Sequence, residues 1–212
     1  MSEPRSARGY HSKRLQLLAE QTVSAPPGDG FEIPILLSAL SVEAFVNELP
    51  DLARQFPKDH ASAQMRGLAQ VLGEAEAERA STELKIQLAH LVLTGRPLDK
   101  GAQPYQDVAL LLDLRNRIVH SRAEAILMPG EGAPAPEKPL IVRRFVAMGV
   151  IAEPANPVSA WRPYLLVREV AQWSVDVTRR LFEWFAGLPT DLLLRGLLEF
   201  FVHPEAATLN AT

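Results

Sequence analysis

The 212-residue chain contains no cysteine. Disulfide bonds, thiolate zinc sites and thiol nucleophiles are therefore all excluded. The chain also lacks a strong charge of either sign, because 22 Lys and Arg residues face 25 Asp and Glu residues for a formal net charge of -3. Such a weak field attracts no polyanion to the molecule as a whole. A nucleic-acid site would have to be a local patch.

Long hydrophobic runs are also missing. Residues 1–10 lack the apolar core of a secretory signal. The apolar run 33–42 ends at Glu43 and is shorter than the roughly 18 residues of a membrane span. Glycine-rich phosphate loops and G-x-S-x-G nucleophile motifs are absent, and the histidines have no metal-site spacing. We expect a cytoplasmic protein with no membrane contact, no metal and no cofactor.

Hydrophobic periodicity predicts an all-α protein. We expect an antiparallel bundle of four long helices at 34–56, 61–93, 107–126 and 163–186. Shorter helices are predicted at 11–22 and at 192–202, the latter capped by Thr190 and Asp191. Pro50 should kink or end the first long helix, and Gly73 is where the second would break.

One insertion departs from the helical pattern. Residues 128–139 have the proline and glycine content of a surface loop. Residues 140–151 are β-branched and apolar, which fits either a small β-hairpin or strand or an extended packed segment. The predicted organisation is a polar extension at 1–30, the bundle at 31–188 with an insertion at 128–157, and a short helix and tail at 189–212.

The aromatic residues near the C-terminus divide into two groups. Trp173 and Phe185 lie on the apolar stripe of their helix and are predicted to be core residues. Phe182 and Trp184 lie off that stripe. Together with Phe200 and Phe201 they are predicted to form a surface for a dimer or a partner protein.

The run from Arg115 to His120 carries the chemistry of the chain. On a helix, Asn116 and His120 are four residues apart and share a face, and the long side chain of Arg115 can reach that face. A guanidinium matches phosphate oxygens, and a neutral imidazole can accept a proton from a hydroxyl group. Arg115, Asn116 and His120 are therefore candidate catalytic residues for phosphate chemistry without a metal.

A structural alternative stays open for these residues. Arg115 and Arg117 could pair with Asp113 and Glu124 on a solvated face, while His120 caps carbonyl groups near a helix end.

Two polar residues of the first long helix are candidate supporting residues. Glu43 and Asn47 are four residues apart and share a face, from which they could orient Arg115 or His120. The alternative is a pair on the helix surface.

Two segments resemble a known family. Residues 110–121 (LLLDLRNRIVHS) resemble the signature helix of HEPN domains, in which an arginine, often a polar residue, and then a histidine follow one another. Residues 37–48 (LSALSVEAFVNE) resemble the opening helix of several such proteins. The resemblance covers residues 33–186, and its motif positions are Arg115, Asn116 and His120.

The resemblance implies a metal-independent endoribonuclease in a toxin or defence setting. It also implies a homodimer in which two motifs face one cleft, RNA as the substrate, and an antitoxin or other protein partner. His120 would help a ribose 2′-hydroxyl attack the adjacent phosphate while Arg115 stabilises the charge that develops. The family also contains non-catalytic members, so a module that binds RNA, a nucleotide or a protein is the alternative. A purely structural dimerisation bundle is a third interpretation, which predicts that His120 is buried or paired away from solvent.

Overall fold

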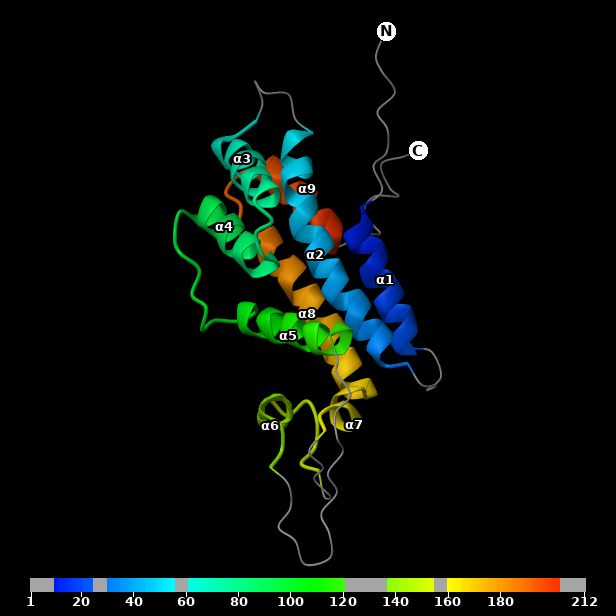
Figure 1. Ribbon diagram of the computed structural model, residues 1–212. Helices are drawn as coiled ribbons and strands as arrows, with labels where there is room; N and C mark the ends of the chain where they lie inside the picture. Colours follow the sequence, from blue (N-terminus) through cyan, green and yellow to red (C-terminus); the bar gives the residue numbers. More distant parts are fainter. Residues whose placement is uncertain (1–9, 25–29, 56–60, 121–136, 155–159, 203–212) are drawn as a thin grey trace, which may run out of the picture.

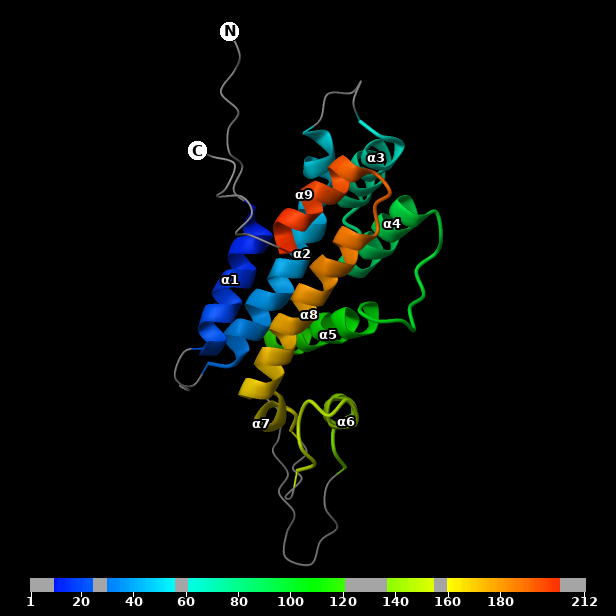
Figure 2. The same cartoon turned by 180° about the vertical axis from the view of Figure 1, so that it is seen from behind.

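The computed structural model describes residues 10–24, 30–55, 61–120, 137–154 and 160–202. Within these residues all regular elements are helices and none is a strand, which confirms the all-α class. The helices are α1 (His11–Ser24), α2 (Glu32–Arg54), α3 (Ala63–Ala77), α4 (Thr82–Thr94), α5 (Tyr105–Val119), α6 (Leu140–Ala147), α7 (Arg162–Leu165), α8 (Arg168–Gly187) and α9 (Leu192–Val202). Figures 1 and 2 show them from opposite sides.

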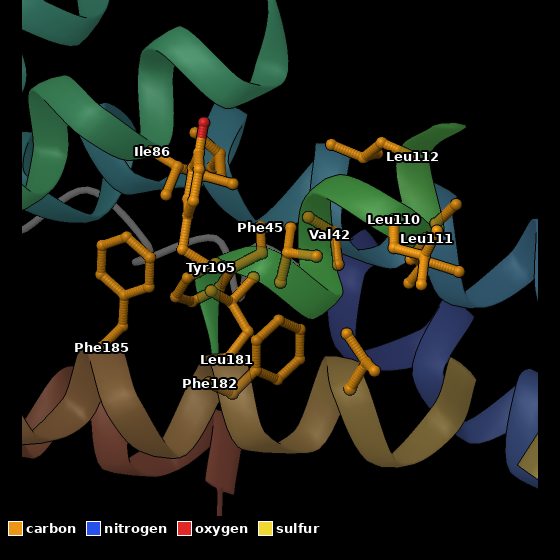
Figure 3. Packing of buried hydrophobic residues seen from close by; sticks show 14 of the residues in the cluster. Val42, Phe45, Ile86, Tyr105, Leu110, Leu111, Leu112, Leu181, Phe182 and Phe185 are labelled. Atoms are coloured by element: carbon orange, nitrogen blue, oxygen red, sulfur yellow. The ribbon is translucent and has the colours of Figure 1, made fainter. Parts of the chain in front are cut away.

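Helix α2 is the centre of the fold. It contacts α1, α3, α4, α5 and α8, and α5 crosses it on the side seen in Figure 1. Phe45 of α2 lies at the middle of an aromatic cluster, with ring centroids 4.5 Å from Phe182, 5.4 Å from Phe185 and 5.2 Å from Phe201. Figure 3 shows part of this core between α2, α5 and α8. The central position accounts for the apolar sequence of α2.

By length and composition, α2 could also cross a membrane. Its most apolar window has a mean hydropathy of 1.3, and 56% of that window is buried inside the protein. The core helix of a soluble bundle meets the same criterion, because it too must be apolar around most of its circumference.

The predicted helix boundaries need three corrections. Helix α2 continues through Pro50 to Arg54, since Leu49, Leu52 and Ala53 around the proline are buried in the core. The long helix predicted at 61–93 is two helices, and the break lies before Ser81, not at Gly73. The Ser81 hydroxyl accepts a hydrogen bond from the Leu84 amide at 3.2 Å and so begins α4.

Gly73 has a packing role instead. A Cβ atom there would lie 2.6 Å from Nη2 of Arg54. That same nitrogen donates to the carbonyl oxygen of Ala69 at 3.0 Å. The glycine therefore lets the Arg54 side chain of α2 lie against α3.

The third correction concerns the end of the bundle where α8 begins. The helix predicted at 163–186 is divided into α7 and α8, because Val167 adopts an extended conformation (φ -125°, ψ 160°). The segment predicted as a strand, hairpin or extended chain contains the helix α6. Its apolar residues Ile141, Val142 and Phe145 lie on one face and are buried, so helical packing outweighs β propensity. The loop predicted at 128–139 and the helix predicted at 121–126 lie mostly outside the described residues.

The first and last described helices, α1 and α9, pack on the bundle. Ala19 and Val23 of α1 are buried against the core, and the Glu48 carboxylate of α2 accepts a hydrogen bond from the first amide of α1, at His11, at 2.6 Å. At the other end the predicted cap of α9 is confirmed, since Asp191 Oδ1 accepts a hydrogen bond from the Leu194 amide at 2.8 Å.

The predicted aromatic surface is wrong for two of its members. Phe182 and Phe201 are each only 1% exposed and pack on Phe45, because α9 folds back over the core. Trp184 is half-buried and stacks on the His90 ring at 5.3 Å. The Phe200 side chain lies outside the description. Trp173 and Phe185 are core residues, as predicted.

Candidate functional site

The candidate site lies where the second half of α5 meets α2. Helix α5 is anchored on the core by the buried residues Leu111, Leu114 and Ile118. These three residues define its inner face, so Asn116 points outward and is exposed, while Arg115 lies at the edge of the helix beside α2. The packing of α5 thus decides which side chains of the motif reach solvent.

Arg115 is held by a carboxylate of the neighbouring helix. Its Nη2 lies 2.7 Å from Oε1 and 2.9 Å from Oε2 of Glu43. The two side chains are 25% and 23% exposed. At this partial burial the pair fixes the guanidinium in place while leaving part of it open to solvent. The structure therefore brings Glu43 and Arg115 together.

Asn116 completes the environment of the guanidinium. Its Oδ1 accepts a hydrogen bond from Nη1 of Arg115 at 2.8 Å. Arg115 has five N–H donors in a planar fork. These contacts involve Nη1 and Nη2, and the Nε–H group donates to no acceptor among the described residues.

His120 is the C-cap of α5 (φ -103°, ψ 21°), and its backbone amide donates to the Asn116 carbonyl oxygen at 2.9 Å. The imidazole is exposed and makes no hydrogen bond to any described residue. It follows Asn116 by one helical turn. An exposed ring at the end of a helix is accessible to a large substrate.

The structural alternative is realised only in part. Arg117 Nε lies 3.2 Å from Oδ2 of Asp113, in an exposed pair one helical turn apart. Arg115 pairs with Glu43 rather than with a residue of its own helix. Glu124 lies outside the described residues.

Asn47 bonds to a group outside the candidate site, the ammonium group of Lys85. Its Oδ1 accepts a hydrogen bond from Nζ of Lys85 at 2.9 Å. Lys85 is 7% exposed and also pairs with Glu76. Asn47 therefore joins α2 to α4, and among the described residues it makes no hydrogen bond to Arg115 or His120. A lysine inside the apolar run of α4 was the sequence signal for these contacts of a buried ammonium group.

Metal-binding clusters are absent from the part of the chain that the structure describes, where no three His, Asp or Glu residues gather closely enough to hold an ion. The donors at Arg115 and the exposed imidazole of His120 are groups that can bind a phosphate and move a proton without one. In this arrangement the guanidinium is fixed by Glu43, and the imidazole is accessible.

Comparison of the sequence with protein-family models finds no match, and neither curated proteins nor solved structures show significant similarity to this chain.

Proposed function

We propose that the protein is a metal-independent endoribonuclease of the HEPN type. The geometry of three side chains supports this function. Arg115 is fixed by Glu43, while Asn116 and His120 are exposed near it on the last turn and C-cap of α5. A polymer can approach such a site from solvent. The α5–α2 contact brings together the two segments that resemble HEPN helices, and the all-α bundle suits that fold.

The residues take separate parts in the reaction. His120 accepts the proton of a ribose 2′-hydroxyl, whose oxygen then forms a bond to the adjacent phosphorus. Arg115 stabilises the negative charge that develops on the phosphate oxygens, and Asn116 holds the guanidinium from the exposed side. The bond from phosphorus to the 5′-oxygen breaks, that oxygen takes up a proton from water, and His120 returns its own proton to the solvent. The products are a 2′,3′-cyclic phosphate and a 5′-hydroxyl.

The biological setting follows from the same resemblance. We propose a cytoplasmic homodimer that acts in a toxin or defence system, with an antitoxin or another protein as its regulator. The expected dimer brings two copies of Arg115 and His120 to one cleft. Light scattering at micromolar concentration should give the mass of a dimer, and a strict monomer would contradict this part of the proposal.

The chemistry is tested by comparing RNA, the same sequence as DNA, and RNA in the presence of EDTA. Cleavage of RNA should persist in EDTA, because His120 and Arg115 need no metal. DNA should resist because it lacks the attacking 2′-hydroxyl. Dependence on a divalent ion, or a product with a free 3′-hydroxyl, would contradict the mechanism.

A second function is favoured by one contact. Glu43 already neutralises Arg115, so a phosphate must compete with a carboxylate for the guanidinium. A non-catalytic HEPN-like module that binds RNA, a nucleotide or a protein would tolerate that competition better than an enzyme would. Binding of RNA without cleavage would favour this module. The exposure of His120 argues against a purely structural bundle.

A further inference from the structure

A polar groove runs along α8, outside the Arg115–His120 site. Its volume is about 640 Å³, and it is lined by Val150 and by one face of α8. Four polar residues of that face recur at every fourth position: Arg168, Gln172, Asp176 and Arg180. At 1.5 Å per residue this row is about 18 Å long. The groove is therefore elongated and suits an extended ligand.

One lining residue of the groove, Trp173, has a buried donor group. Trp173 is 8% exposed and packs edge-on against Phe145 of α6 with ring centroids 4.8 Å apart. The buried indole nitrogen has no hydrogen-bond partner among the residues that the structure describes. Buried donors in native proteins are nearly always paired, with protein, water or a ligand.

The acidic residues along the row are mostly neutralised. Oδ1 of Asp176 lies 3.2 Å from both Gln172 and Arg179. Arg180 lies 2.9 Å from Asp107, a buried carboxylate of α5. Glu169 is the one acidic lining residue that has no cation partner among the described residues, and it lies in the first turn of α8, where the helix dipole favours it.

Unpaired arginines gather at the same end of the molecule. Figures 1 and 2 show α6, α7 and the start of α8 together there. Arg144 of α6, Arg162 of α7 and Arg168 of α8 are exposed, and none has a carboxylate partner among the described residues. A chain with a net charge of -3 thus carries, at one end, three exposed arginines without a carboxylate partner among the described residues, and one of them, Arg168, lines the groove.

We propose that this groove, together with Arg168 in its lining and the exposed Arg144 and Arg162 of the neighbouring helices α6 and α7, binds the phosphate backbone of single-stranded RNA. The planar guanidinium matches phosphate oxygens, and arginines spread over three helices can follow several phosphates of one strand. Gln172 and Glu169 offer a donor and acceptors to base edges. This inference deepens the proposed function and rests on it for the choice of RNA, but it assigns binding to residues that take no part in cleavage.

The test measures binding without chemistry. Fluorescence anisotropy is recorded with a labelled oligoribonucleotide whose riboses are all 2′-O-methylated, so that no 2′-hydroxyl can attack. The variants are Arg144→Glu, Arg162→Glu and Arg168→Glu. Arg96→Glu is the matched control, because Arg96 is exposed, lies between α4 and α5, and gives the same change in charge. Arg180 is left intact because it pairs with buried Asp107.

Each of these three arginine variants should weaken binding by about tenfold, which corresponds to the loss of one charge-assisted hydrogen bond. Each should also lower the salt dependence of binding. Arg96→Glu should change the affinity little. Equal affinity in all variants, or an equal loss in Arg96→Glu, would overturn the proposal. Displacement of the oligonucleotide by equimolar ATP would overturn it too, because the groove would then take a mononucleotide. Failure of RNA cleavage alone would leave the binding result standing.

Discussion

Glu43 of α2 and Arg115 of α5 are separated by 72 positions in the sequence and form a half-buried ion pair. The contact links the packing of the bundle to the candidate chemistry, because it holds the guanidinium beside α2. Removing either partner leaves the other charge without its main contact.

The Glu43–Arg115 pair should therefore contribute measurably to stability. In a double-mutant cycle with Glu43→Gln and Arg115→Gln, we expect a coupling free energy of about 1 kcal/mol, at the upper end for partly exposed pairs. Urea denaturation of the four proteins measures it. The exposed pair Asp113–Arg117, with both side chains 44% exposed, is the control and should couple by about 0.3 kcal/mol. Equal coupling in the two pairs would contradict the special role of Glu43.

Substitutions of Asn47 and Asn116 should affect stability and RNA cleavage differently. Asn47→Ala removes a hydrogen bond from the buried Lys85 ammonium group, so it should lower the free energy of unfolding by about 1–3 kcal/mol and leave RNA cleavage unchanged. Asn116→Ala removes the acceptor of the Arg115 Nη1 hydrogen bond, so it should lower the rate of RNA cleavage and leave the free energy of unfolding nearly unchanged. Urea denaturation and a cleavage assay on both variants decide this. Loss of activity in folded Asn47→Ala would restore the sequence-based interpretation of Asn47 as a supporting residue.

The side-chain cap of α9 at Asp191 should contribute to the stability of the whole protein. Asp191→Ala removes the acceptor of the Leu194 amide and should cost about 1 kcal/mol, whereas Asp191→Asn should keep most of that stability. Thermal unfolding followed by circular dichroism measures both. If α9 were dispensable, the two variants would melt like the wild type.

Tyr105 should make the protein sensitive to alkali. Burial raises the pKa of its hydroxyl above the ordinary value of 10.0, although a hydrogen bond from Gln87 at 2.8 Å opposes that shift. As the pH rises above 10.0, the unfolded chain loses this proton first, so the stability present below that pH is progressively lost. Tyr105→Phe should lose less stability than the wild type between neutral pH and the region above 10.0. Lys13, whose pKa is lowered by burial, acts in the opposite direction in both proteins and cancels from the comparison. If the free energy of unfolding fell equally with pH in the wild type and in Tyr105→Phe, the assignment of this alkaline sensitivity to Tyr105 would be refuted.

Local patterns predicted most helices, but not where they break. Apolar periodicity located α2, α5, α8 and α9. The division of α3 from α4 depends on a cap at Ser81. The sequence alone does not distinguish this serine from one that caps no helix. Helix α6 was misread because its β-branched residues are buried by tertiary packing, which no local propensity records.

The neighbours of the candidate site were also predicted only in part. Helical spacing placed Glu43 and Asn47 on one face of α2, and the structure puts only Glu43 beside Arg115. The contact of Asn47 with Lys85 depends on where α4 docks, and that position is set by the core rather than by α2 itself. Phe182 and Phe201 were misplaced for the same reason, because the return of α9 over Phe45 is a long-range event.

The central claim is tested most directly by the RNA cleavage rate of Arg115→Ala and His120→Ala beside the wild type, in EDTA and with folding checked by circular dichroism. Both variants should fold, since His120 is exposed and Arg115 lies outside the buried Leu111, Leu114 and Ile118 face. Each should lose about 10²–10⁴-fold in rate, as expected for a proton acceptor or a charge-stabilising donor. His11→Ala, which alters another exposed histidine, should cleave like the wild type. Equal rates in all four proteins would contradict the catalytic role of Arg115 and His120.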